Sequence, residues 1–274
     1  MRIGFIGAGK AGCSLGKYFS QNNELVGYAS KSHESAEEAA ALTASSAFAD
    51  AAELASRCEV LFITTPDGQI EPAWESLKER VEGSGGTLAG KIICHCSGAM
   101  PSTALQGAEE LGASAYSVHP LFALSSKCVP ASELSQAFFA IEGSRDRIDE
   151  IAGMLAELGN PYQVIETEEK ARYHAAAVLA SNQVIALYRL ACNELCKCGF
   201  GAEAAEKALA PLFLGNAEHL ACDGAAAALT GPAERGDFAT IKKHLACLDG
   251  QTREVYRMLN DTLLQIAAEK HGNA

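Results

Sequence analysis

A glycine-rich segment near the start of the chain constrains the fold most strongly. An apolar stretch at residues 2–6 runs directly into it, and the segment reads Gly7-Ala8-Gly9-Lys10-Ala11-Gly12. The spacing matches the G-x-G-x-x-G pattern that joins a strand to a helix in dinucleotide-binding βαβ units. There the first glycine permits a tight turn, the second lets a pyrophosphate approach the backbone, and the third allows close helix–strand packing. The helix start would offer free N–H groups to phosphate oxygens. We therefore predict that these residues bind a dinucleotide.

Strand and helix patterns alternate as far as Glu166. The predicted strands are residues 2–6, 24–30, 60–64, 91–96, 113–118, 138–141 and 162–165, and the predicted helices are residues 10–20, 35–42 and 146–158. Continuous apolar runs of this kind are typical of strands buried in a parallel sheet. The alternation predicts an α/β fold, a doubly wound Rossmann domain over residues 1–166.

No strand pattern follows Glu166. Residues 168–198 predict one unusually long helix, and shorter helices are predicted at residues 202–212, 215–228, 237–248 and 252–270. We therefore expect an all-α C-terminal domain over residues 167–274 that takes part in substrate binding. A helix longer than the usual globular range is often shared between subunits, so we expect a homodimer through this domain.

Charge and composition exclude several classes of function. The net charge is −12 and no basic run exists, which argues against nucleic acid and anionic membranes as partners. The longest clean apolar runs, such as residues 175–180, are far shorter than a membrane span. A cleavable leader is not expected, because its removal would destroy the glycine motif. We interpret the ten cysteines as buried, reduced thiols of a cytoplasmic protein, with no metal site.

The end of the second strand distinguishes between nicotinamide cofactors. An acidic residue there would bind the ribose 2′-hydroxyl of NAD. This chain instead has Ser30-Lys31-Ser32, and the first acid is Glu34. Serine hydroxyls and a lysine ammonium suit a 2′-phosphate, so we predict NADP. The alternative is that Lys31 is an ordinary solvated surface residue.

The third strand ends in Thr64-Thr65-Pro66-Asp67. Pro66 cannot continue a sheet ladder, so the chain turns at the edge where doubly wound sheets bind ligands. We assign Thr65 and Pro66 to the cofactor side. Asp67 is expected to cap a helix that begins near Gln69.

The fourth strand ends in Cys94-His95-Cys96-Ser97-Gly98. His95 points to the opposite face from its two cysteine neighbours, so the three cannot share one metal. We predict a catalytic role for Ser97 and substrate contacts for His95 and Gly98. The alternative is that Ser97 only caps a helix at residues 102–111.

The next strand ends at His119, directly before Pro120. A residue before proline is held extended, which would fix the imidazole at the sheet edge. A lone histidine is more often structural. Because three strand ends converge on one crevice, we nevertheless include His119 among the catalytic candidates.

Lys170 and His174 are four residues apart and share a helix face, which Ala177 and Ser181 continue. Lys170 could protonate the product as hydride arrives, and His174 or Ser181 could orient the substrate. Asn182 lies further round the helix and is a substrate or interface candidate. A lysine at a helix start is, alternatively, simply solvated.

The segment Gly231 to Asp237 interrupts the helical region with a Gly-Pro pair. Arg235 in this loop could bind a substrate carboxylate through two hydrogen bonds. Asp237 is placed on the substrate side as well, although it is also well positioned as a helix N-cap.

The chain resembles, over nearly its full length, bacterial proteins with a Rossmann-like domain followed by an uncharacterised helical domain. These are relatives of β-hydroxyacid dehydrogenases, prephenate dehydrogenase and pyrroline-5-carboxylate reductase. The blocks that carry the resemblance are GFIGAGKAG at residues 4–12, CHCSG at 94–98, HPL at 119–121, KARYHAAAVLASN at 170–182 and GPAERGD at 231–237.

The resemblance implies roles for individual residues. Lys170 matches the catalytic lysine of β-hydroxyacid dehydrogenases, whereas His174 stands where that pattern has asparagine. His119 matches the HPM histidine of prephenate dehydrogenase, which lies near the substrate. Some members are similar to an alternative ketopantoate reductase. We therefore predict NADPH-dependent reduction of a small 2-oxo acid, with ketopantoate as leading candidate. The alternatives are imine reduction like that of pyrroline-5-carboxylate reductase, and an NADP-binding sensor without catalysis.

Overall fold

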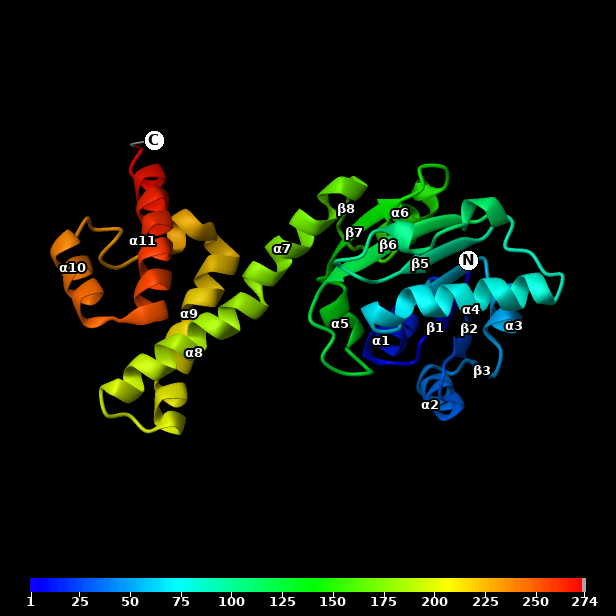
Figure 1. The fold of residues 1–274 in the computed structure, drawn as a ribbon, viewed down its shortest axis with the longest axis horizontal. Helices are drawn as coiled ribbons and strands as arrows, with labels where there is room; N and C mark the ends of the chain where they lie inside the picture. Colours follow the sequence, from blue (N-terminus) through cyan, green and yellow to red (C-terminus); the bar gives the residue numbers. More distant parts are fainter. Residues whose placement is uncertain (273–274) are drawn as a thin grey trace. The chain divides into compact units, whose positions relative to one another are not determined.

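The structure is a computed structural model that describes residues 1–272 (Figure 1). One eight-stranded sheet has the order β3-β2-β1-β4-β5-β6-β7-β8. The strands are β1 (Arg2–Ile6), β2 (Glu24–Ala29), β3 (Ser46–Phe48), β4 (Val60–Ile63), β5 (Ile92–His95), β6 (Ser114–Leu121), β7 (Phe138–Gly143) and β8 (Tyr162–Val164). This sheet confirms the predicted Rossmann class of α/β fold.

Two hydrophobic clusters cover the two faces of the sheet. Neighbouring residues of a strand point to opposite faces, so Phe5 enters one cluster and Ile6 the other. The helices of this part of the chain are α1 (Lys10–Phe19), α2 (His33–Thr43), α3 (Ala51–Arg57), α4 (Ile70–Gly83), α5 (Ala131–Leu134) and α6 (Ile148–Glu157). Helices α1, α2 and α6 pack in the first cluster and α3 and α4 in the second, as double winding requires.

The sheet is mixed rather than wholly parallel. Strands β6 and β7 are antiparallel, and every other neighbouring pair is parallel. A parallel pair needs a long crossover, usually a helix. Between β6 and β7 only the four-residue α5 forms, so the chain returns in the opposite direction.

Within this part of the chain, some short elements were not predicted and one predicted helix is absent. Strand β3 and helix α3 were not predicted, because a three-residue strand leaves little periodic signal. The helix expected at residues 102–111 does not form. Two single 3₁₀ turns, η2 (Ser102–Ala104) and η3 (Glu109–Leu111), stand there, and Gly107 between them has φ +81°. A left-handed residue cannot continue a right-handed helix.

The chain divides into two compact units, from Met1 to Val178 and from Leu179 onward. The later helices are α7 (Lys170–Ala180), α8 (Asn182–Lys197), α9 (Ala202–Ala228), α10 (Phe238–Cys247) and α11 (Gly250–Lys270), with the 3₁₀ turn η4 (Thr167–Glu169) before them. Ser181, with ψ −84°, interrupts the single helix expected at residues 168–198. Conversely, α9 joins the two helices predicted at residues 202–212 and 215–228, and a non-helical Gly224 lies inside the second of them.

Candidate functional site

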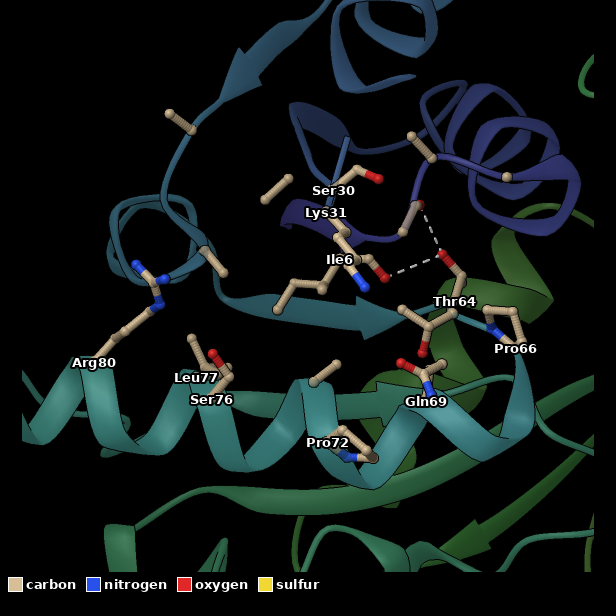
Figure 2. A pocket seen from close by; sticks show the side chains of 18 residues that line it. Ile6, Ser30, Lys31, Thr64, Pro66, Gln69, Pro72, Ser76, Leu77 and Arg80 are labelled. Atoms are coloured by element: carbon tan, nitrogen blue, oxygen red, sulfur yellow. Dashed lines mark hydrogen bonds between the residues drawn. The ribbon is translucent and has the colours of Figure 1, made fainter. Parts of the chain in front are cut away.

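A pocket of about 590 Å³ lies at the carboxyl ends of β1, β2 and β4 (Figure 2). Seven of the predicted cofactor residues line it, namely Gly7, Ala8, Gly9, Ser30, Lys31, Thr65 and Pro66. Carboxyl ends of parallel strands are where doubly wound sheets bind ligands. The pocket therefore occupies the position that the glycine motif predicted.

Each of the three motif positions has glycine for a different structural reason. Gly7 has φ +111°, which only glycine adopts readily. A Cβ at Gly12 would overlap the carbonyl oxygen of Gly7, so this glycine permits α1 to pack on the loop. A Cβ at Gly9 would meet nothing within 4 Å. Gly9 therefore leaves open space beside the start of α1, while Lys10 and Ala11 form its first turn outside the pocket lining.

Two threonines at the end of β4 have different tasks. The hydroxyl of Thr64 donates to the carbonyl oxygen of Gly7 at 2.9 Å, which attaches the glycine loop to β4 (Figure 2). The Thr65 hydroxyl is buried and has no hydrogen-bond partner among the residues that the structure describes. Because an unpaired buried hydroxyl is unfavourable, Thr65 fits a ligand that supplies the missing partner.

Two cations border the pocket. Lys31 from the loop after β2 and Arg80 from the last turn of α4 both border it (Figure 2), and no carboxylate lines it among residues 1–272. Arg80 also lies 3.5 Å from Asp50. Ser32, by contrast, accepts a hydrogen bond from the Ser35 amide and caps α2. These residues fit a ligand with an additional phosphate.

Arg80 was not predicted from the sequence because it lies far along the chain from the motif. The spacing of residues in α4 nevertheless indicates which face of this helix lines the pocket. Ala73, Ser76, Leu77 and Arg80 recur at intervals of three and four residues and form one helix face toward the pocket.

A second cluster surrounds Lys170, whose side chain is only 1% exposed. Its Nζ donates to the Ser117 hydroxyl at 2.5 Å, and Ser117 in turn donates to the carbonyl oxygen of Ser97 at 3.0 Å. Burial lowers the pKa of Lys170 to about 8, although the negative charge of Glu142 opposes this shift. Lys170 is therefore a buried cation that releases its proton more readily than an exposed lysine.

Glu142 on β7 is the buried acid of this cluster, and the sequence analysis missed it. It accepts hydrogen bonds from the amide and hydroxyl of Ser102 at 2.7 and 2.8 Å, and from the Thr167 hydroxyl at 2.7 Å. A single acid inside the apolar strand FFAIEG was the available signal. Such an acid is buried only when it is paired.

His119 lies beside Tyr173 and His174 of α7. Its Nδ1 is 2.7 Å from the Tyr173 hydroxyl, and its ring centroid is 6.4 Å from that of His174. Burial lowers the pKa of His119 to about 4, and the positive charge of Lys170 adds to this effect. His119 is therefore neutral at physiological pH. The structure thus brings together three of the predicted catalytic residues, Lys170, His174 and His119.

Ser97 and His95 have structural partners instead. The Ser97 hydroxyl donates to Asp67 at 2.9 Å and accepts from the amides of Ala99 and Met100. We expected Asp67 to cap α4. It contacts Ser97 instead and makes no capping hydrogen bond to α4. His95 is fully buried, and its ring nitrogens bond the Pro101 carbonyl oxygen and the Ser97 amide. No ring nitrogen of His95 is left for the predicted substrate contact.

Gly98 lies beside His119 and His174, and the remaining candidates belong to the second unit. Ser181 donates to the side chain of Asn182 at 3.1 Å, and Asp237 caps α10 by accepting from the Thr240 amide at 3.0 Å. Arg235 is exposed. As substrate-binding residues these four remain predictions.

The cysteines differ in exposure, and the described residues offer no metal site. All ten cysteines are free thiols, and four of them are exposed rather than buried as expected, namely Cys196, Cys198, Cys222 and Cys247. Among residues 1–272, no group of three or more His, Cys, Asp or Glu side chains could hold a metal ion.

Family models match both parts of the chain. Residues 1–120 match the Rossmann-like domain, and residues 137–263 match a domain of unknown function, DUF2520. The chain joins a Rossmann-like domain to a DUF2520 domain. This combination confirms the resemblance drawn from the sequence blocks.

Solved structures share this fold over almost the whole chain. A protein from Thermotoga maritima is 24% identical with a TM-score of 0.76, and covers 98% of this chain and 99% of its own. A proposed NADP oxidoreductase from Bacteroides fragilis is 22% identical with a TM-score of 0.72, covering 97% and 98%. A pyrroline-5-carboxylate reductase from Streptococcus pyogenes is 16% identical with a TM-score of 0.62, covering 100% and 96%. No curated protein matches the sequence.

Proposed function

We propose that this chain is an NADPH-dependent reductase that acts on the carbonyl or imine group of a small carboxylate-bearing compound. The observation that carries the proposal is the pocket at the glycine loop. Lys31 and Arg80 give it positive charge without a lining carboxylate, and the buried Thr65 hydroxyl lacks a partner. A 2′-phosphate would gain from both cations, whereas NAD would not.

The similar folds support the same class of reaction. Their names include a proposed NADP oxidoreductase, pyrroline-5-carboxylate reductases and imine reductases. These names favour NADP and the reduction of C=N or C=O groups. Among 2-oxo acids, ketopantoate remains the first compound to test, and pyrroline-5-carboxylate is the corresponding cyclic imine.

Different residues of the chain would bind the cofactor, contact the substrate and supply the proton. Bound NADPH supplies a hydride for the carbonyl or imine carbon. The amides at the start of α1 would hold the pyrophosphate. His119 and His174 are half-buried, so a substrate reaches them before it reaches the fully buried Lys170. Lys170 would hold positive charge beside the reacting group and supply the proton that the product gains.

The test is titration of the purified full chain with NADPH and NADH, followed by NADPH oxidation with a panel of 2-oxo acids and cyclic imines. We expect tight NADPH binding and turnover of at least one panel member. Tight binding with no turnover would support a sensor without catalysis. No association with either dinucleotide would refute the proposal.

We propose further that the second unit forms a homodimer. Leu179, Ile185, Leu212 and Met258 are each more than 60% exposed, and a contiguous exposed apolar patch marks an interaction surface. The segment Thr167–Lys197 is also long and apolar enough to cross a membrane, by length and composition alone. Its first turns, however, contain the buried Lys170 that bonds Ser117 of the sheet. A second copy of this chain is therefore the occupant that we assign to the apolar surface.

A further inference from the structure

We propose that Tyr173 is a positioning residue that holds His119 with its proton on Nε2, and that the site consequently prefers a neutral carbonyl substrate over a cationic iminium. This inference rests on the proposed reductase function and specifies its substrate class. Neither the sequence motifs nor the similar folds assign a role to Tyr173.

The two side chains meet because of their places in the fold. Tyr173 lies three residues after Lys170 on α7 and so shares its face. His119 lies near the end of β6, where the following proline keeps its backbone extended. The tyrosine hydroxyl is 2.7 Å from Nδ1 of His119, and the rings meet edge to face at 86°. Nζ of Lys170 lies 5.5 Å from the centre of the Tyr173 ring.

The chemistry of the two groups determines the direction of this hydrogen bond. Burial raises the pKa of Tyr173, so the side chain remains a phenol, while the lowered pKa of His119 keeps its imidazole neutral. A phenol O–H is a stronger donor than a neutral imidazole N–H, and an imidazole nitrogen is a stronger acceptor than a phenol oxygen. Tyr173 therefore donates to Nδ1, and the single imidazole proton resides on Nε2.

Nε2 of His119 points to the loop that follows β5. A Cβ added at Gly98 would lie 2.8 Å from this nitrogen and 2.7 Å from Cδ2 of His174. No residue of the described chain accepts a hydrogen bond from Nε2. The Nε2 proton is therefore left for the substrate.

The charges around His119 favour negative charge on that substrate. Burial is the largest cause of the lowered pKa of His119, and the positive charge of Lys170 is the next, whereas the negative charge of Asp67 opposes them. The buried acid Glu142 accepts three hydrogen bonds, and its charge acts on Lys170. A carbonyl oxygen gains negative charge as hydride adds to its carbon, which a neutral N–H donor and the Lys170 ammonium stabilise. A protonated imine carries a positive charge that the same ammonium repels.

The first experiment reads the tautomer directly. Nitrogen–proton correlation spectra of the imidazoles in the full chain, with His119→Gln to assign the signals, report which nitrogen carries the proton. We expect protonated Nε2 in the wild type and a mixture of tautomers in Tyr173→Phe. A wild-type His119 protonated on Nδ1 would overturn the proposal, whether or not the variant folds.

The second experiment is kinetic. Tyr173→Phe should lower kcat for a 2-oxo acid about tenfold with a smaller change in KM and unchanged NADPH affinity. The matched control is Tyr162→Phe, which removes an exposed phenol on β8 and should behave as wild type. Equal kinetics for the two variants would contradict the role of Tyr173.

The substrate preference has its own readout. We expect a higher kcat/KM for a 2-oxo acid than for a cyclic imine of similar size, and the reverse order would overturn the substrate class. Failure to bind NADPH would refute the reductase function alone, because the tautomer of His119 is measured without the cofactor.

Discussion

The hydroxyl of Ser97 donates a 2.9 Å hydrogen bond to the carboxylate of Asp67. This bond joins the loop after β5 to the loop after β4, which are neighbouring strands of the sheet. The β4 loop carries Thr65 at the dinucleotide pocket, and the β5 loop carries Gly98 beside the imidazoles. The two parts of the candidate site within the first unit are thus mechanically linked.

Replacement of two motif glycines should separate binding from folding. Gly9→Ala adds a methyl group in open space, so we expect an unchanged melting temperature but dinucleotide affinity lowered at least tenfold, because the methyl group occupies the approach to the α1 amides. Gly12→Ala places a methyl group against the Gly7 carbonyl, so it should destabilise the fold itself. Thermal melts and NADPH titrations of both variants make the comparison. Normal binding by Gly9→Ala would contradict the assigned pyrophosphate position.

The two cations of the pocket should determine cofactor preference. Lys31→Ala and Arg80→Ala should each raise the Kd for NADPH about tenfold, since a charge-assisted hydrogen bond contributes about 1.5 kcal/mol or more. The Kd for NADH should hardly change. Lys17→Ala, an exposed lysine of α1 outside the pocket lining, is the control. Equal losses for both dinucleotides would show that neither cation reads the 2′-phosphate.

The unpaired Thr65 hydroxyl should make the free protein less stable than it could be. Thr65→Val removes this hydroxyl at nearly constant volume, so we expect the ligand-free protein to gain about 1 kcal/mol in its free energy of unfolding. NADPH affinity should fall at the same time. Denaturant unfolding with and without NADPH measures both effects. A loss of stability in the free protein would argue that the Thr65 hydroxyl already has a hydrogen-bond partner there.

Lys170 should influence both the stability and the activity of the protein. Its pKa of about 8 is below the ordinary value of 10.5, so at pH 7 the folded protein holds a charge that the unfolded chain solvates better. Lys170→Met removes this cost but leaves the buried Glu142 without its neighbouring cation, so we expect the variant to be less stable than the wild type at pH 7. Between pH 8 and 10.5 the folded wild type loses this proton before the unfolded chain does, so its relative stability should rise.

The activity of the same variant is the second measurement. We expect kcat/KM of the wild type to fall above pH 8, as Lys170 loses its charge, and Lys170→Met to lower kcat about a hundredfold. Unfolding curves and pH–rate profiles are the measurements. A flat wild-type profile through pH 9 would remove Lys170 from the reaction.

The apolar surface of the second unit should be covered in solution. Light scattering at micromolar concentration should report twice the mass of the 28.7 kDa chain. Ile185→Glu and Leu212→Glu replace two exposed apolar side chains and should shift the protein toward the monomer. A monomeric wild type would refute the dimer.

Local sequence patterns located most of the residues at the glycine-loop end of the pocket. The glycine motif, Lys31 and Thr65 follow strands whose apolar runs are easily recognised, and strand ends of one sheet must share an edge. Arg80 and Glu142 could not be found in this way. Each of these two residues lies far in the sequence from the groups that it contacts. Its role therefore depends on which helix face or neighbouring strand the fold brings to it.

Histidines were the hardest residues to interpret. His95 and His119 have equal status in the sequence, since each ends a strand of the same sheet. The difference between them arises from their partners: backbone groups occupy both ring nitrogens of His95, whereas Tyr173 occupies only one of His119. The sequence of a strand does not predict a hydrogen-bond partner that comes from a helix more than fifty residues further along the chain.

The hydrogen bond from Thr167 to Glu142 has a practical consequence for anyone who wishes to isolate the nucleotide-binding half. A fragment cut at Glu166 would leave a buried carboxylate short of one donor and would discard the neighbouring ammonium of Lys170. A fragment that continues to Val178 retains both, and its spectra would resemble those of the intact chain.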